Sequence, residues 1–473
     1  MSLKVSKNVG IDLENISKNV FNVSKVINML KRKVDLVLEN WKNNKDRYPL
    51  IIKGARQIGK TTSIRQFAKK NYQNLVELNF IRNPEYIQAF ENTSNPKDII
   101  MTLSLLNPDF NFIPGETLLF IDEIQKYPNA ATSLKFFYEQ HEYDVICSGS
   151  LLGIKYKKIS SISVGYKTDY TMYSLDFEEF LWAKGYTENQ IEYIYKFMKE
   201  LKPLPEILFN KLNDLFKQYI YCGGMPAIVD RFITQDNFSG VFEMQKQIYL
   251  DYEEDITNYV EGLDTARVLN VYRHITSQLA KDNHKYQITK LGHGARFRDY
   301  RGCEEWLKDA GIVNLAYNVM DLTLPLKGNE IDNNLRMYYG DTSFLVASVD
   351  DESKKDFVQN GNFDIYSGAL FENLVAESLV KQGYKDLFFY KNESSTIELD
   401  FLIRIKNEIV PIEVKAKRGK AVSLNKILEN KILNYGIKLS MNNVGFEKNI
   451  FTFPYFLAFL LKRFFEENEI IQW

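Results

Sequence analysis

The feature that most constrains this 473-residue chain is a glycine-rich octapeptide near its beginning. Residues 54 to 61 read Gly-Ala-Arg-Gln-Ile-Gly-Lys-Thr, the G-x-x-x-x-G-K-T pattern of a phosphate-binding loop. An apolar run at residues 50 to 52 precedes the loop, and a helical stretch at residues 62 to 70 follows it. A loop between a buried strand and a helix N-terminus can turn its backbone N–H groups toward a phosphate. The segment therefore predicts a nucleotide site in an α/β fold.

The residues of this loop have separate expected roles. Lys60 is expected to reach the β- and γ-phosphates, and the Thr61 hydroxyl is expected to ligate Mg²⁺. A chance match is the alternative interpretation, and the flanking strand and helix argue against it. The cofactors are therefore predicted to be ATP and Mg²⁺, although the motif alone does not separate ATP from GTP. The residues predicted to bind nucleotide are Gly54, Gln57, Ile58, Gly59, Lys60, Thr61 and Thr62.

Two further apolar runs end in polar residues that suit phosphate chemistry. Residues 117 to 123, Thr-Leu-Leu-Phe-Ile-Asp-Glu, have the pattern of a buried parallel strand that delivers carboxylates to its end. Asp122 is expected to hold Mg²⁺ through water, and Glu123 to orient and deprotonate the attacking water. The run at residues 143 to 147 ends at Ser148, which is predicted to lie beside the γ-phosphate as the sensor 1 residue. The competing interpretation of Ser148 is an ordinary turn serine.

Composition excludes several other classes of protein. The chain has 60 basic and 61 acidic residues, so its overall charge neither requires nor excludes a nucleic-acid partner. Three cysteines without C-x-x-C spacing and only four histidines argue against a disulfide framework and a zinc site. No window reaches 18 uninterrupted apolar residues, and the beginning of the chain has no long apolar segment. A soluble cytoplasmic protein without a membrane segment is expected, and its oligomeric state is not predicted.

The order of predicted strands and helices divides the chain into three parts, residues 1–184, 185–340 and 341–473. In the first part, a helix at residues 20 to 41 leads into the phosphate loop, and alternating strands and helices predict a parallel sheet with helices on both faces. The second part begins with a mostly helical stretch. It is interrupted by a tight turn at residues 221 to 226, which contain Gly223, Gly224 and a proline.

The second part also has the order of elements found in a winged helix. Helices are expected at residues 267 to 279 and 295 to 310, followed by strands at 313 to 319 and 323 to 326. Such a module contacts DNA in some proteins and serves as a protein docking or lid module in others, and a charge run can also be a solvated face. Basic residues gather here as on a phosphate-contacting surface, namely Lys281, Lys285, Lys290, Arg296, Arg298 and Arg301.

The third part contains a second group of candidate catalytic and metal-binding residues. A helix at residues 368 to 383 carries Glu372, and strands expected at residues 398 to 403 and 409 to 415 carry Asp400 and an E-x-K sequence, Glu413 and Lys415. Asp400 and Glu413 are predicted Mg²⁺ ligands, Lys415 is predicted to position or activate water, and Glu372 could add a carboxylate. This arrangement suits a metal-dependent nuclease. The alternative is that these residues form structural ion pairs in a domain without activity.

Together these motifs resemble one large family. The stretches GARQIGKTT, LLFIDEIQ, CSGSLLG, YSLDFEEFLW, YCGGMPAIV, GARFRDY, EEWLKDAGIV, LRMYYGDTSFL, GALFENLVAESL, ELDFLI and PIEVKA are similar to those of bacterial and archaeal AAA+-type P-loop ATPases with a C-terminal domain of unknown function. That C-terminal domain resembles PD-(D/E)xK nucleases. The resemblance implies an ATPase core, a winged-helix segment and a restriction-endonuclease-like α/β domain. In residues 163 to 167 a tyrosine follows Gly165, where several relatives have an arginine or a lysine, so the resemblance assigns no arginine finger there. Arg296 and Arg298 are candidates for that role.

The function predicted from the sequence is Mg²⁺-dependent ATP hydrolysis, coupled to a conformational change of the nuclease-like domain and acting on DNA. The alternative is a nucleotide-switched regulator or scaffold whose C-terminal domain is catalytically inactive and binds a protein partner.

Overall fold

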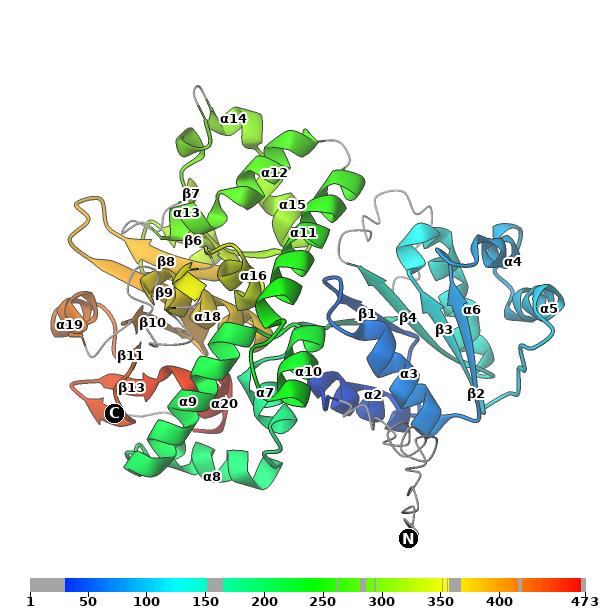
Figure 1. Ribbon diagram of the computed structural model, residues 1–473, viewed down its shortest axis with the longest axis horizontal. Coiled ribbons are helices and arrows are strands. Elements are labelled where there is room, and N and C mark those ends of the chain that lie inside the picture. Colours follow the sequence, from blue (N-terminus) through cyan, green and yellow to red (C-terminus); the bar gives the residue numbers. More distant parts are fainter. Residues whose placement is uncertain are drawn as a thin grey trace, which may run out of the picture.

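The structure is a computed structural model, and it describes residues 30–150, 165–260, 263–280, 286–292, 295–350, 352–354, 356, 367–415 and 419–468. Two β-sheets dominate this part of the chain. Figure 1 shows the N-terminal sheet, coloured blue to cyan, on one side of the molecule and the C-terminal sheet on the other, with green helices between them.

The N-terminal sheet has five strands in the described residues, and all neighbouring pairs are parallel. Their order is β2-β3-β4-β1-β5, so β4 separates the strand before the phosphate loop from the strand that ends in Asp122. Because parallel strands end at one edge, the predicted site residues meet there. The strands are β1 Leu50–Gly54, β2 Asn74–Asn79, β3 Thr117–Asp122, β4 Asp144–Ser150 and β5 Thr168–Thr171.

Helices cover both faces of this sheet, because its strands are apolar on both sides. Ile51, Leu119 and Val145 pack under α5 (Pro96–Leu106) and α6 (Leu134–Gln140), whereas alternate residues face α2 (Lys33–Asn43) and α3 (Lys60–Asn71). The predicted parallel α/β fold of this part is confirmed. Of the helix expected at residues 20 to 41, the structure describes only the part from residue 30, and α2 begins at Lys33.

Helices α7 to α11 follow the N-terminal sheet. They are α7 Phe177–Ala183, α8 Glu188–Lys199, α9 Glu206–Cys222, α10 Pro226–Gln235 and α11 Val241–Tyr259. The glycine pair between α9 and α10 marks a close approach of three segments. A Cβ atom on Gly224 would lie 2.1 Å from the Leu175 carbonyl oxygen, and one on Gly223 would lie 2.5 Å from the Asp341 carboxylate. The Gly224 N–H donates to Asp341 at 3.0 Å, so the turn joins residues that are far apart in the sequence.

The region expected to form a winged helix departs from that pattern. Its helices are α12 Thr265–Arg273, α13 Ile275–Leu279, α14 Phe297–Tyr300 and α15 Cys303–Asp309. Gly302 has a φ of +87°, which divides the helix expected at residues 295 to 310. The strand expected at residues 323 to 326 is absent from these described residues, and a 3₁₀ turn, Leu326–Asn329, follows instead.

The missing wing strand is replaced by a longer one that belongs to the next sheet. Strand β6 (Val313–Val319) pairs antiparallel with β7 (Glu330–Tyr339), and β6 also pairs parallel with β8. The described C-terminal sheet has eight strands in the order β12-β13-β11-β10-β9-β8-β6-β7, and it therefore begins before the expected boundary at residue 341. Its remaining strands are β8 Leu387–Lys391, β9 Glu398–Ile405, β10 Glu408–Val414, β11 Gly436–Ser440, β12 Gly445–Glu447 and β13 Ile450–Pro454.

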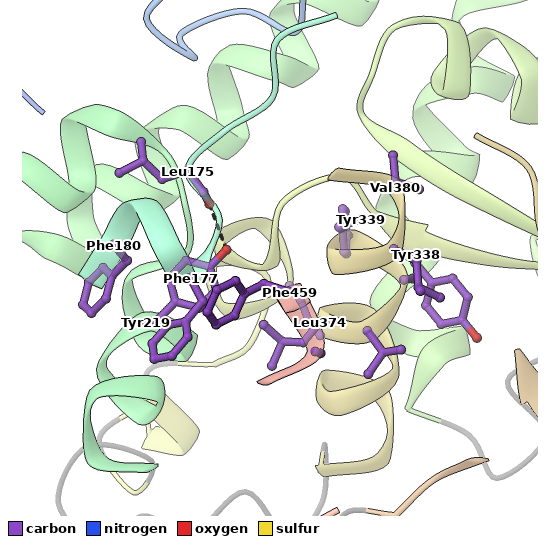
Figure 2. Packing of buried hydrophobic residues seen from close by; sticks show 14 of the residues in the cluster. Leu175, Phe177, Phe180, Tyr219, Tyr338, Tyr339, Leu374, Val380 and Phe459 are labelled. Atoms are coloured by element: carbon purple, nitrogen blue, oxygen red, sulfur yellow. Dashed lines mark hydrogen bonds between the residues drawn. The ribbon is translucent and has the colours of Figure 1, made fainter. Parts of the chain in front are cut away.

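The elements that pack around this sheet in the described residues include α16 Thr342–Ala347, α18 Ser367–Lys381, α19 Val422–Glu429, η8 Tyr455–Leu460 and α20 Leu461–Glu467. One hydrophobic core runs from the helices of the N-terminal sheet into these elements. Figure 2 shows part of this core, where Phe177, Tyr219, Leu374 and Phe459 come together from α7, α9, α18 and η8. The two sheets are therefore joined by packed side chains. No helix in the described residues is both long enough and apolar enough to cross a lipid bilayer.

Candidate functional site

The phosphate loop joins β1 to α3, as the motif predicts. Gly59 has a φ of +89° and forms the N-cap of α3, a conformation that glycine adopts without a steric cost. Gly54 is needed for a different reason, since a Cβ atom there would lie 2.4 Å from the Met172 carbonyl oxygen. Gln57 also has a left-handed φ, and Ile58 is buried in the core. The buried side chain of Ile58 thus fixes the loop to the core, while the loop backbone turns at the edge of the sheet.

The ammonium group of Lys60 lies inside this loop. It donates to the carbonyl oxygens of Gly54 at 2.9 Å and Ala55 at 2.7 Å. Burial lowers the pKa of Lys60 to about 8, and the nearby Glu123 and Asp122 carboxylates oppose that shift. The side chain is therefore held by two weak acceptors in a partly desolvated position, and a phosphate oxygen would be a stronger partner.

Asp122 is the centre of the polar contacts at the end of β3. The Thr61 hydroxyl lies 3.3 Å from its carboxylate, and the Asn79 amide donates to it at 3.0 Å. Ser148, within β4, is buried and donates a hydrogen bond to the same carboxylate. The structure thus brings together Thr61 and Asp122, the two predicted Mg²⁺ ligands of this site. It places the predicted sensor residue Ser148 against Asp122.

Glu123 stands at the turn that follows β3. Its φ of +58° is a left-handed conformation that is uncommon for this residue type. Gln125 donates a hydrogen bond to the Glu123 carboxylate and lies 3.3 Å from the Ser150 hydroxyl. The sequence motif did not single out Gln125, whose position depends on the turn at Glu123.

A buried arginine before α2 supports the loop from outside the motif. Arg32 donates to the Ile58 carbonyl oxygen at 2.9 Å and to the Tyr173 carbonyl oxygen at 2.7 Å, and it pairs with Glu179 at 3.0 Å. Glu179 and Asp176 also cap α7 reciprocally, each accepting the backbone N–H of the other. The FEEFLW segment therefore supports the phosphate loop through the contacts of Arg32.

A cavity of about 820 Å³ opens beside the loop, large enough for a nucleotide. The loop and α3 form one wall, and α10 and α11 form the facing wall. The facing wall is acidic, and Glu123 adds a carboxylate from the N-terminal sheet. An acid-rich segment at residues 251 to 255 was the available sequence signal for this wall. The residues that line the cavity include Arg32, Arg56, Gln57, Gly59, Lys60, Thr61, Thr62, Glu123, Asp230, Asp251, Glu254 and Asp255.

A second polar cluster lies in the C-terminal sheet, around the buried side chain of Arg336 on β7. Its guanidinium lies 3.5 Å from the Glu372 carboxylate and 3.7 Å from that of Asp400, and it pairs closely with Glu398. The Tyr338 hydroxyl donates to Glu372 at 2.9 Å. The sequence singled out Glu372 and Asp400 but not Arg336, which comes from a strand assigned to another part of the chain.

The E-x-K residues are engaged by partners of their own. Lys415 pairs with Glu413 at 2.8 Å, and the second oxygen of Glu413 accepts the Leu424 N–H at 3.1 Å. Asp400, on the neighbouring strand, accepts the Val414 N–H at 2.7 Å. Burial, with the repulsion of Glu372, raises the pKa of Asp400 to about 6. Among the described residues, no three His, Cys, Asp or Glu side chains are grouped so that they could hold a metal ion.

The predicted basic surface is partly described. Lys290, Arg296, Arg298 and Arg301 are exposed near α14, at the end of the molecule that is uppermost in Figure 1. Lys281 and Lys285 lie outside the described residues, as do residues 163 and 164 of the segment without an arginine.

Comparison with known families divides the chain into three matches. Residues 46–181 match an AAA domain. Residues 213–355 and 367–456 match two domains of unknown function, DUF8612 and DUF4143. No curated protein matches the chain. The nuclease likeness of the C-terminal part stays a prediction.

Comparison with solved structures finds distant likenesses. The Thermotoga maritima RuvB Holliday junction branch migration motor is 13% identical, with a TM-score of 0.28, over 73% of this chain and 94% of that one. An ADP complex of S. cerevisiae Hsp104 is 13% identical, with a TM-score of 0.24, over 59% of this chain and 38% of the Hsp104 chain. C. elegans PCH-2 is 12% identical, with a TM-score of 0.25, over 43% of this chain, which spans 58% of the PCH-2 chain. Residues 46–181 therefore match an AAA domain, and they contain a phosphate-binding loop between a parallel strand and a helix.

Proposed function

We propose that this chain binds ATP with Mg²⁺ and hydrolyses it at the edge of the N-terminal sheet. The observation that carries the proposal is the convergence of four side chains, Lys60, Thr61, Asp122 and Glu123, around the phosphate loop. Lys60 would stabilise the charge on the phosphates, and Glu123 would orient and deprotonate the attacking water.

The donor set fits Mg²⁺, a hard cation that prefers oxygen ligands. The Thr61 hydroxyl and the Asp122 carboxylate are adjacent oxygen donors, and the hydrogen bonds from Asn79 and Ser148 hold Asp122 in place. When bound, the cation would neutralise charge on the phosphates. Ser148 would act by orienting Asp122, which is our interpretation of its predicted sensor role.

The experiment compares nucleotide binding with turnover in two variants. Lys60→Ala should abolish ATP binding, because the lysine stabilises the phosphates in both the ground state and the transition state. Glu123→Gln should retain binding within about threefold and slow phosphate release by at least about 100-fold, because a general base acts mainly on the barrier. Calorimetric titration and a phosphate-release assay provide the two readouts.

Matched controls come from the same domain. Lys69→Ala removes an exposed lysine from α3, and Glu139→Gln removes an exposed carboxylate at the end of α6. Both should bind and hydrolyse ATP like the wild type. Equal loss of binding in Lys60→Ala and Glu123→Gln would refute the separate roles.

The function of the C-terminal part is the second element of the proposal. We propose that the nucleotide state is relayed to it, because one hydrophobic core joins the two sheets. A metal-dependent nuclease would need Asp400 and Glu413 to bind the metal. The competing candidate, an inactive domain that binds a protein partner, is favoured by Arg336 and Lys415, which already pair with these carboxylates.

DNA is the nucleic acid that the exposed basic side chains near α14 would contact. Replacing Lys290, Arg296 and Arg298 by alanine should flatten the salt dependence of duplex DNA binding by about two to three units of log Kd per log salt, since each phosphate contact releases counterions. The control is alanine at Lys97, Lys211 and Lys385, which are exposed elsewhere and should leave the slope unchanged. A wild-type chain that fails to bind duplex DNA at low salt would remove DNA from the proposal.

A further inference from the structure

We propose that Arg56 and Asp255 form a latch between the phosphate loop and α11, and that the terminal phosphate of a nucleoside triphosphate opens it. This inference rests on the proposed function, and it assigns to that site a residue pair that senses the nucleotide state. Arg56 occupies a variable position of the phosphate loop motif and Asp255 belongs to the acid-rich segment, but the sequence does not pair them, because they are 199 positions apart and lie on opposite walls of the cavity.

Three contacts tie the loop to one turn of α11. The Arg56 guanidinium pairs with Asp255, the Gln57 amide donates to Asp251 at 2.9 Å, and the Tyr252 hydroxyl donates to the Arg56 carbonyl oxygen at 2.7 Å. Asp255 is buried, so its charge depends on Arg56 as a counter-ion. These contacts hold α11 against the loop.

A bound triphosphate would act on this pair in two ways. Arg56 belongs to the loop that would cradle the phosphates, and guanidinium groups bind phosphate bidentately, so a phosphate oxygen competes with Asp255 for it. The phosphates would also repel the carboxylates on the facing wall, which are those of Asp251, Glu254 and Asp255. Both effects separate α11 from the loop. Asp255, once unpaired, would be more stable in water than buried.

The turn of α11 that carries the latch also contacts the C-terminal part. The ring of Tyr252 packs edge-on against Phe344 of α16, with 4.8 Å between ring centroids. At the start of α16, both the backbone N–H and the hydroxyl of Thr342 donate to Glu377 of α18, at 2.8 and 2.6 Å. The same helix carries Glu372 of the Arg336 cluster. Opening the latch would therefore shift α16 and α18.

The experiment measures ATP and ADP affinity in Asp255→Asn, Arg56→Ala and the double variant. Asp255→Asn should tighten ATP binding about fivefold to tenfold, because Arg56 no longer has to be taken from a carboxylate. Arg56→Ala should weaken the binding of ATP more than the binding of ADP. In the Arg56→Ala background, Asp255→Asn should tighten ATP binding by a smaller factor, because only the repulsion between the phosphates and Asp255 is then relieved, and this non-additivity is one that a purely structural role would not give.

The control is Glu243→Gln, which removes an exposed carboxylate from the first turn of the same helix and should leave both affinities unchanged. The latch is refuted if Asp255→Asn leaves ATP affinity within twofold of the wild type, or gives the same gain without Arg56. If Asp255→Asn does not fold, the ratio of ATP to ADP affinity in Arg56→Ala decides, and an unchanged ratio overturns the proposal. A wild-type chain that binds neither nucleotide overturns the proposed function itself.

Discussion

At the scale of single residues, Arg336 shows how a buried charge can organise a cluster. Its guanidinium, fully enclosed, has carboxylates on several sides and lies 4.3 Å from the ring centroid of Phe389. Glu372 is buried and Asp400 is partly buried, and burial raises the pKa of both carboxyl groups. Burying a charged carboxylate costs free energy, and the guanidinium of Arg336 offsets part of this cost as an internal counter-ion.

Replacing Arg336 by methionine should therefore destabilise the C-terminal part by about 3–5 kcal/mol, because it removes a buried cation that lies against three carboxylates. Differential scanning calorimetry should show a lower melting temperature. Arg404→Met, on the exposed side of β9, is the control and should melt like the wild type. An Arg336→Met variant with unchanged melting would show that the carboxylates are not stabilised by this pair.

The positions of the candidate residues were predictable from sequence where one short motif contains them. Lys60 and Thr61 follow from the loop pattern, and Asp122 and Glu123 follow from the end of one apolar run. Arg32 and Asp255 could not be found in this way, since each meets the loop only through the folded chain. The proposed nucleotide and metal roles of these residues stay predictions.

At the scale of elements, continuous apolar runs identified the buried strands of the N-terminal sheet, because strands covered on both faces carry apolar residues at every position. In the region expected to form a winged helix, local patterns located β6 but misplaced its partner strand. The partner of β6 is β7, eleven residues further on, and its other neighbour β8 starts only at Leu387. Pairing over such separations is set by the whole sheet, which a local pattern does not contain. The glycine pair before α10 was read as a tight turn, and its closest contacts, with Leu175 and Asp341, lie in distant segments.

At the scale of the whole molecule, the two sheets share one core, and α11 touches both the phosphate loop and α16. Such packing can transmit a change at the nucleotide site when its elements have two arrangements. The sequence indicated a separate chemistry for each of the two sheets, and both chemistries stay predictions. It did not predict the contact between the two sheets, because each surface of that contact is assembled from several segments of the chain.

The measurement that tests the account most directly is hydrogen–deuterium exchange of the Glu123→Gln variant, with and without ATP and Mg²⁺. We expect exchange to fall in the phosphate loop and to change in α11, α16 and α18, since a bound but unhydrolysed triphosphate holds the latch open. Lys60→Ala, under the same conditions, should show no change. A change confined to residues 46–181, with α16 and α18 unaffected, would contradict the claim that the nucleotide state reaches the C-terminal sheet.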